Sequence, residues 1–342
     1  MPDYTRDEAR DWAKANMHGI CGCLLPTFNS SLTKINEAAI RHDVRLSREY
    51  GYWGTLLIPE PAVTTDQFRD MIDYAVDEAK QVGLRTMLSA AFSTLEESVE
   101  MTKYAESAGI DLVMPGYPAM FYPETEDEIF EYTAAIGNAS SLGIVLFVIH
   151  HWNFYRQHPS GTLGPDLIGR LIDEIPTVVG IKNEIGMPGV GGMVEVFERF
   201  GDKVVVTEPF EQNAPNWVPK YDMQFMGTDC YEFAGPKVAE MFTLLRGGQF
   251  EDAMKIWWQI HPARQVRMAQ AGEYMAGGNL INRVIWKYEA WLNGFNGGPV
   301  RQPTLRISDA QMRAIRVGHE KSKLTIAPGT DADFFVGRNP MD

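Results

Sequence analysis

A lysine at the end of an apolar segment is the residue of this sequence whose position most directly implies chemistry. Lys182 follows the apolar residues 178–181, which are typical of a buried strand. Burying an ammonium group is unfavourable unless a carboxylate pairs with it or the amine loses its proton. A neutral buried amine attacks carbonyl carbons and can form a Schiff base. The alternative is a structural lysine that extends into solvent or pairs with Glu208.

Two histidines follow another apolar segment. His150 and His151 come directly after residues 144–149. Adjacent strand residues face opposite sides, so at most one of them lines a common pocket if the strand continues. That histidine could be a general base, a metal ligand or a buried structural residue.

A metal site would have to combine residues from distant parts of the chain. The acidic candidates are Glu60, Glu208 and Asp229, together with one of the histidines, and no two have the close spacing of typical ligands. The cysteines Cys21 and Cys23 also lack the spacing of a zinc knuckle. We therefore expect no metal and no cofactor.

The elements that must position these residues alternate regularly. Apolar runs typical of strands occupy residues 19–25, 54–58, 84–88, 112–114, 144–149, 178–181, 204–206 and 223–226. Helical patterns lie between them at 66–80, 95–108, 127–136, 165–175, 193–200 and 237–245, the first capped by Thr64 or Thr65. Eight strands that alternate with helices predict a (β/α)8 barrel, an α/β fold. A doubly wound sheet should have a glycine-rich turn after its first strand, and Pro26-Thr27-Phe28 stands there instead.

The length suggests one barrel with additions. We expect a helical extension at 1–18, the barrel at 19–250, and a helical segment with a tail at 251–342, its clearest helices at 252–270 and 280–292. The net charge of −14 argues against nucleic acid and anionic membranes as partners. Three cysteines, a polar N-terminus and no long apolar run predict a cytoplasmic protein without a membrane span.

In a barrel the active site lies where the strands end. The polar candidates at these ends are Thr27, Glu60, Thr64, Thr65, Ser89, Ser93, Tyr117, Tyr122, His150, His151, Lys182, Glu184, Glu208, Glu211, Thr228, Asp229 and Tyr231. Aromatic residues gather on two neighbouring loops, at Tyr117, Phe121, Tyr122, Trp152 and Phe154. They could line an apolar substrate pocket, or they could serve loop packing or a subunit contact.

The order of motifs resembles the dihydrodipicolinate synthase / N-acetylneuraminate lyase family of Schiff-base barrel lyases. The similarity covers about residues 19–303. It rests on Leu25-Pro26-Thr27-Phe28, Pro115-Gly116-Tyr117, Val179-Gly180-Ile181-Lys182, and the pattern from Lys287 to Gly294 followed by Val300-Arg301-Gln302-Pro303. The resemblance implies that Lys182 forms an imine with a 2-oxo acid and that the protein is a homotetramer built from dimers.

The chain departs from this family at three places, one of them after Lys182, where the usual acidic residue is replaced by Asn183 and Glu184 comes one position later. Residues 58–65 replace the family's Gly-Thr-Thr-Gly-Glu loop, and Pro59 and Pro61 lack the N–H groups that would hold a substrate carboxylate. Phe147 aligns with the catalytic tyrosine of strand five, and phenylalanine cannot transfer a proton. The chain is therefore predicted to be a divergent member.

The sequence thus predicts a lyase or aldolase, or a hydratase-aldolase, that acts through Lys182 on a carbonyl or 2-oxo acid substrate. The aromatic loops and the lost Thr-Thr pair favour a bulky or aromatic substrate. Tyr117, His150 or His151 would transfer the proton. The predicted substrate-binding residues are Thr27, Glu60, Thr64, Thr65, Phe147, Trp152, Glu184, Glu208, Thr228 and Asp229. The alternatives are a metal-dependent barrel hydrolase or decarboxylase, and a catalytically silent relative that binds a carbonyl metabolite.

Overall fold

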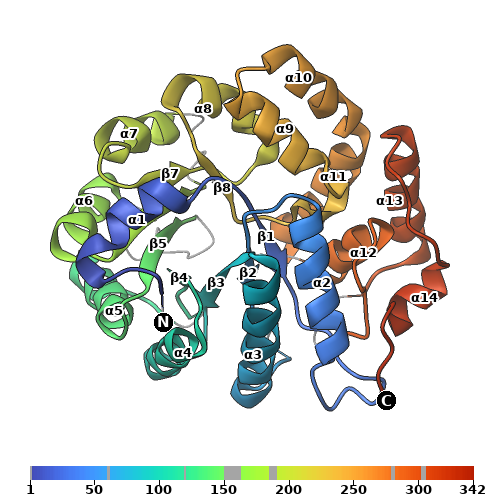
Figure 1. Cartoon of the computed structure of the whole chain (residues 1–342), viewed down its shortest axis with the longest axis horizontal. Coiled ribbons are helices and arrows are strands. Elements are labelled where there is room, and N and C mark those ends of the chain that lie inside the picture. Colours follow the sequence, from blue (N-terminus) through green and yellow to red (C-terminus); the bar gives the residue numbers. More distant parts are fainter. Residues whose placement is uncertain are drawn as a thin grey trace. The chain divides into compact units, whose positions relative to one another are not determined.

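Eight parallel strands alternate with helices in the computed structural model of the chain, which describes residues 2–59, 62–118, 121–149, 163–184, 191–278, 282–301 and 306–342 (Figure 1). The strands are β1 (Gly19–Leu24), β2 (Gly54–Leu57), β3 (Arg85–Ala90), β4 (Leu112–Pro115), β5 (Gly143–Val148), β6 (Val178–Asn183), β7 (Val205–Thr207) and β8 (Phe225–Gly227). Hydrogen-bonded neighbours follow the order β7-β6-β5-β4-β3-β2-β1-β8. This order, with a helix after each strand, is that of a (β/α)8 barrel, and the predicted fold is confirmed.

One helix follows each strand of the barrel, and further helices lie before the first strand and after the last one. After the strands come α2 (Glu37–Glu49), α3 (Thr65–Val82), α4 (Leu95–Ala108), α5 (Glu126–Asn138), α6 (Pro165–Glu174), α7 (Gly191–Phe200), α8 (Ala214–Tyr221) and α9 (Lys237–Arg246). The additional helices are η1 (Arg6–Glu8), α1 (Ala9–Asn16), α10 (Phe250–Gln259), α11 (His261–Gly278), α12 (Arg283–Leu292), α13 (Asp309–Lys321) and α14 (Asp331–Val336). Short helices η4 (Glu211–Asn213) and η5 (Tyr231–Ala234) follow β7 and β8. No helix in the described ranges is long and apolar enough to cross a membrane.

The chain divides into two units, of which the first comprises Met1–Cys21 and Arg85–Thr228. Within it the register sets Lys182 of β6 opposite Phe147 of β5 on one side and Thr207 of β7 on the other. The Gly227 amide donates a hydrogen bond to Thr207 Oγ1 at 3.3 Å, which joins β8 to β7. The carboxyl ends of β5 to β8 therefore meet in this unit.

The core of the first unit lies between its strands and the helices outside them. Val, Ile and Leu make up most of β5 and β6, and these strands are buried nearly throughout, as expected for parallel strands covered on both faces. Gly137 lets α5 approach β5 closely, because a Cβ atom there would lie 2.5 Å from Ile144 Cδ1. The packing fixes the strands that carry Lys182 and its neighbours.

The second unit comprises Gly22–Leu84 and Asp229–Asp342. Helices α12, α13 and α14 share an apolar cluster whose largest members are Tyr288, Trp291 and Phe334. Thr64 caps α3 by accepting the Gln67 amide at 3.2 Å, and Gly83 ends the helix in the left-handed conformation. The predicted cap at Thr64 or Thr65 is thus found at Thr64.

Candidate active site

Lys182 lies inside β6 rather than directly after it. β-Branched residues on both sides of Gly180 favour the strand, which extends through Asn183, two residues beyond the predicted end. All residues of β6 are buried, and Lys182 is only 5% exposed. The strand therefore holds an amine in a place where charge needs a partner.

Three side chains surround the Lys182 amine. Glu184 Oε1 lies 3.0 Å from Lys182 Nζ, and the two side chains are only 12% and 6% exposed. Lys182 Nζ also donates a hydrogen bond to Thr228 Oγ1 at 3.3 Å. The Phe147 ring centre lies 3.9 Å from the same nitrogen, within cation–π distance. The structure thus brings together four predicted site residues.

Glu208, directly after β7, is a second buried carboxyl group in this unit. Asn213 Nδ2 and Trp217 Nε1 donate hydrogen bonds to its two oxygens. Burial raises the pKa of Glu208 above its usual range, and the neighbouring carboxylates Glu184 and Glu211 raise it further. Two carboxyl groups in unlike environments thus lie within electrostatic range of each other: Glu184 beside an amine, and Glu208 among neutral donors.

The Tyr117 hydroxyl forms a hydrogen bond with a residue of α5. It forms a 2.7 Å hydrogen bond with Thr133 Oγ1 of α5, and the Thr133 hydroxyl itself donates to the Ile129 carbonyl. The Tyr117 proton is therefore directed at Thr133. The ring stacks on Phe121, and burial raises the pKa of Tyr117 above its usual range.

The remaining described candidates lie in the second unit. Thr27 is fully buried and its Oγ1 accepts a 2.5 Å hydrogen bond from Lys287 Nζ, which also donates to the Pro26 carbonyl at 3.0 Å. Asp229 forms a 2.7 Å ion pair with Arg267. Thr64 Oγ1 is the α3 cap, and Thr65 is the first residue of that helix.

Four predicted residues lie outside the described ranges: Glu60, His150, His151 and Trp152. Where the structure describes the chain, no group of three or more His, Cys, Asp or Glu side chains could hold a metal ion. The proposed metal set depended on Glu60 and a histidine, so that set as a whole is not described.

Sequence reasoning missed the residues that hold the site residues in place. Asn213 and Trp217 lie five and nine positions after Glu208, on η4 and α8 respectively. Their distance from Glu208 in the sequence does not indicate a contact unless the path of the chain after β7 is known. Lys287 was noted as part of a family motif, but its contact with Thr27 spans 260 positions and has no local signal.

A barrel with a buried lysine near the carboxyl ends of its strands defines a class of protein. Comparison of the sequence with known families names that class. The model of the dihydrodipicolinate synthetase family matches residues 60–316, most of the chain. The chain therefore belongs to this family, whose members are lyases. The resemblance predicted from the sequence is confirmed.

Individual relatives are distant. The 4-hydroxy-tetrahydrodipicolinate synthase of Methanopyrus kandleri is 26% identical over 330 residues, which cover 91% of this chain and 98% of the relative. The crystal structure of dihydrodipicolinate synthase from Aquifex aeolicus matches with a TM-score of 0.75 at 17% identity, covering 91% of this chain and all of the other. N-acetylneuraminate lyase from Fusobacterium nucleatum gives a TM-score of 0.71 at 19% identity, over 89% and 98%. At such identities the structural likeness concerns the fold.

Proposed function

We propose that this protein is a lyase of the class I aldolase type, which forms a Schiff base between Lys182 and the carbonyl group of its substrate. The observation that carries the proposal is a buried amine inside β6, in contact with Glu184, Thr228 and Phe147. Family membership supports the lyase class. The contact with Glu184 supports it further, because a carboxylate beside the amine can remove its proton.

The chemistry follows from the electron demand of an iminium ion. The Lys182 amine adds to the carbonyl carbon, and loss of water leaves a C=N bond that carries positive charge. This group accepts the electron pair when the bond between the second and third carbons from nitrogen breaks. In a dehydration it accepts the pair of a C–H bond on the second carbon as a base takes the proton, and the enamine so formed expels hydroxide from the third carbon. Hydrolysis of the imine then releases the second product and regenerates the amine. No metal or cofactor takes part in these steps.

The substrate we propose is a 2-oxo acid or another small carbonyl compound. The Phe147 ring covers one side of the amine, which favours an apolar group next to the reacting carbon. The proposal includes a homotetramer and a cytoplasmic location, which light scattering of the purified chain and fractionation of cells would check.

Borohydride trapping tests the proposal directly. Incubation with pyruvate or an aromatic 2-oxo acid and sodium borohydride should add the mass of the reduced substrate to the protein, and peptide mapping should place it on Lys182. Lys287 is an internal control, because it is also buried but donates to Leu25, Pro26 and Thr27. Absence of any adduct across a panel of 2-oxo acids and aldehydes, or an adduct on Lys287 alone, would overturn the proposal.

A further inference from the structure

We propose that Glu184 is the residue that transfers protons during Schiff-base chemistry at Lys182. This inference rests on the proposed function and adds a catalytic role to a residue for which no such role was predicted. The position from which a tyrosine would act in this family is held by Phe147, which has no proton to give. Another group has to perform the transfer.

Geometry favours Glu184 over the other described groups near the amine. Its Oε1 lies 3.0 Å from Lys182 Nζ, within the reach that a general base requires. Thr228 is close as well, but a hydroxyl group is a far weaker base than a carboxylate. Glu208 already accepts hydrogen bonds from Asn213 and Trp217.

The balance of protons can be written with Glu184 alone. The carboxylate accepts a proton from the Lys182 ammonium, and the neutral amine forms the C–N bond as the carbonyl π electrons move to oxygen. Glu184 gives this proton to the alkoxide of the adduct, takes one from the adduct nitrogen, and donates it to the hydroxyl group, which leaves as water and gives the iminium ion. In carbon–carbon cleavage, Glu184 then takes the proton of the β-hydroxyl group and delivers it to the enamine carbon.

The variant Glu184→Gln tests this role because its amide keeps the size and can still accept a hydrogen bond from Lys182. We expect kcat to fall by about 10²-fold or more, since that is the usual contribution of a general acid–base residue. Borohydride should still trap substrate on Lys182, only more slowly. Glu195→Gln, the same change on an exposed residue of α7, should leave both readouts unchanged.

A second variant separates catalysis from structure. Phe147→Tyr in the Glu184→Gln background places a phenol beside the amine, and it should restore part of kcat and introduce a new pH dependence. Wild-type turnover in Glu184→Gln, with trapping intact, would overturn the role of Glu184 and leave the Schiff base standing. Failure of the wild-type protein to trap any carbonyl compound would instead remove the proposed function itself.

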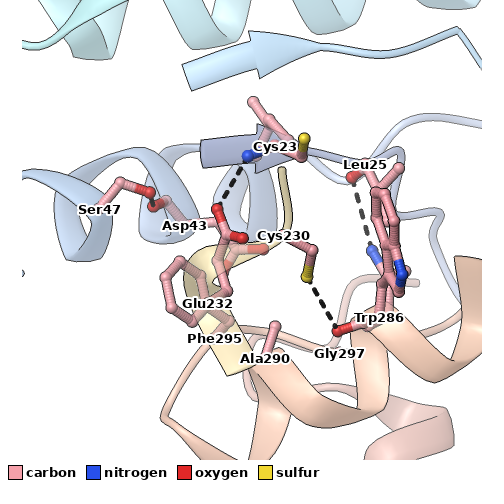
Figure 2. A pocket seen from close by; sticks show the side chains of 12 residues that line it. Cys23, Leu25, Asp43, Ser47, Cys230, Glu232, Trp286, Ala290, Phe295 and Gly297 are labelled. Atoms are coloured by element: carbon pink, nitrogen blue, oxygen red, sulfur yellow. Dashed lines mark hydrogen bonds between the residues drawn. The ribbon is translucent and has the colours of Figure 1, made fainter. Parts of the chain in front are cut away.

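A separate observation in the second unit concerns Glu232. This residue of η5 is 2% exposed, and Cys23 N donates a 2.9 Å hydrogen bond to its Oε1 (Figure 2). Its Oε2 is buried and has no hydrogen-bond partner among the residues that the structure describes. Gly22 makes the approach possible, because a Cβ atom there would lie 2.1 Å from Glu232 Oε1.

Glu232 lines a cavity that is large enough for a water molecule. About 20 Å³ is open to the centre of a water molecule, and about 10–15 Å³ is enough for one. The other lining residues include Cys23, Asp43, Cys230 and Lys287. We infer that one ordered water molecule occupies this cavity and forms a hydrogen bond with Glu232 Oε2. Water suits the site because it can accept a hydrogen bond from the carboxylic acid or donate one to the carboxylate, whereas a cation suits only the carboxylate.

A high-resolution crystal structure of the whole chain tests the hydration site. The expected result is a single peak within hydrogen-bond distance of Oε2, retained in Glu232→Gln and lost in Glu232→Met, whose apolar side chain offers no partner. If Glu232→Met does not fold, the wild-type and Glu232→Gln structures still show whether the water molecule is present. An empty cavity, or a potassium ion identified by anomalous scattering from crystals grown in KCl, would overturn the inference.

Discussion

Lys182 Nζ and Glu184 Oε1 lie 3.0 Å apart, and both side chains are nearly buried. The two residues are separated by one position, so the alternation of an extended chain directs them to the same side. A nearly buried pair of this kind is costly to break, because the remaining charge loses its ion-pair partner and has little access to water. Stability and reactivity at β6 therefore depend on the same contact.

The variant Lys182→Met separates these two effects. It should abolish trapping and lower kcat by about 10³-fold or more, because the nucleophile is gone. It should also lower the free energy of unfolding by about 3 kcal/mol, since Glu184 loses its ion-pair partner while it stays nearly buried. The double variant Lys182→Met/Glu184→Gln should recover much of this stability, as measured by urea denaturation, without any activity. An equally unstable double variant would show that the ion pair is not the cause.

Trp217→Phe tests how Glu208 is held. The change removes an N–H donor to a buried carboxylate, a bond type worth about 1.5–3 kcal/mol. The pKa of Glu208 is already raised by burial, and loss of the donor should raise it further. The variant should therefore be more destabilised at pH 8 than at pH 5, because Glu208 has to ionise at the higher pH. The control Trp258→Phe changes an indole that is 62% exposed and should show no such pH-dependent difference in unfolding free energy.

The sequence predicts the parts of this structure that depend on local patterns. The eight apolar runs predict the strands, and Lys182 stands out because an amine follows four apolar residues. Contacts made across the fold leave no such pattern. The bond between Tyr117 and Thr133 requires α5 to lie against the end of β4, and the bond between Lys287 and Thr27 joins residues 260 positions apart. Such contacts follow from packing rather than from spacing, so the supports of Glu208 and Tyr117 could not be predicted.

Tyr117→Phe distinguishes a catalytic tyrosine from a structural one. Because the hydroxyl group donates to Thr133, its removal should cost about 1 kcal/mol of unfolding free energy. If Glu184 transfers the proton, kcat should change by far less than the about 10²-fold loss expected for a general acid. Thr133→Val should cost a similar amount of stability, and the double variant less than the sum, because both changes remove one bond. A large loss of kcat in Tyr117→Phe alone, with normal stability, would favour Tyr117 as the proton donor.

Glu232→Gln should flatten the dependence of stability on pH. Burial raises the pKa of Glu232 from 4.5 to about 7, and the charged or titratable groups around it include Tyr52, Cys23, Asp43, Asp229, Cys230 and Lys287. Because the folded state holds this proton more tightly than the unfolded state, the stabilisation is complete below pH 4.5 and is lost as the pH rises to about 7. A shift of this size corresponds to about 3 kcal/mol.

Urea denaturation of wild type and Glu232→Gln across this range gives the contribution of Glu232 as a difference, in which the titrations of the other groups largely cancel. The wild-type advantage should shrink by about 3 kcal/mol between pH 4.5 and pH 7 and then stay constant. Glu240→Gln, on the exposed face of α9 in the same unit, should run parallel to wild type at every pH. If Glu232→Gln also runs parallel, the carboxyl group is already ionised in the folded protein at low pH. The cavity must then supply a donor or a cation to its second oxygen.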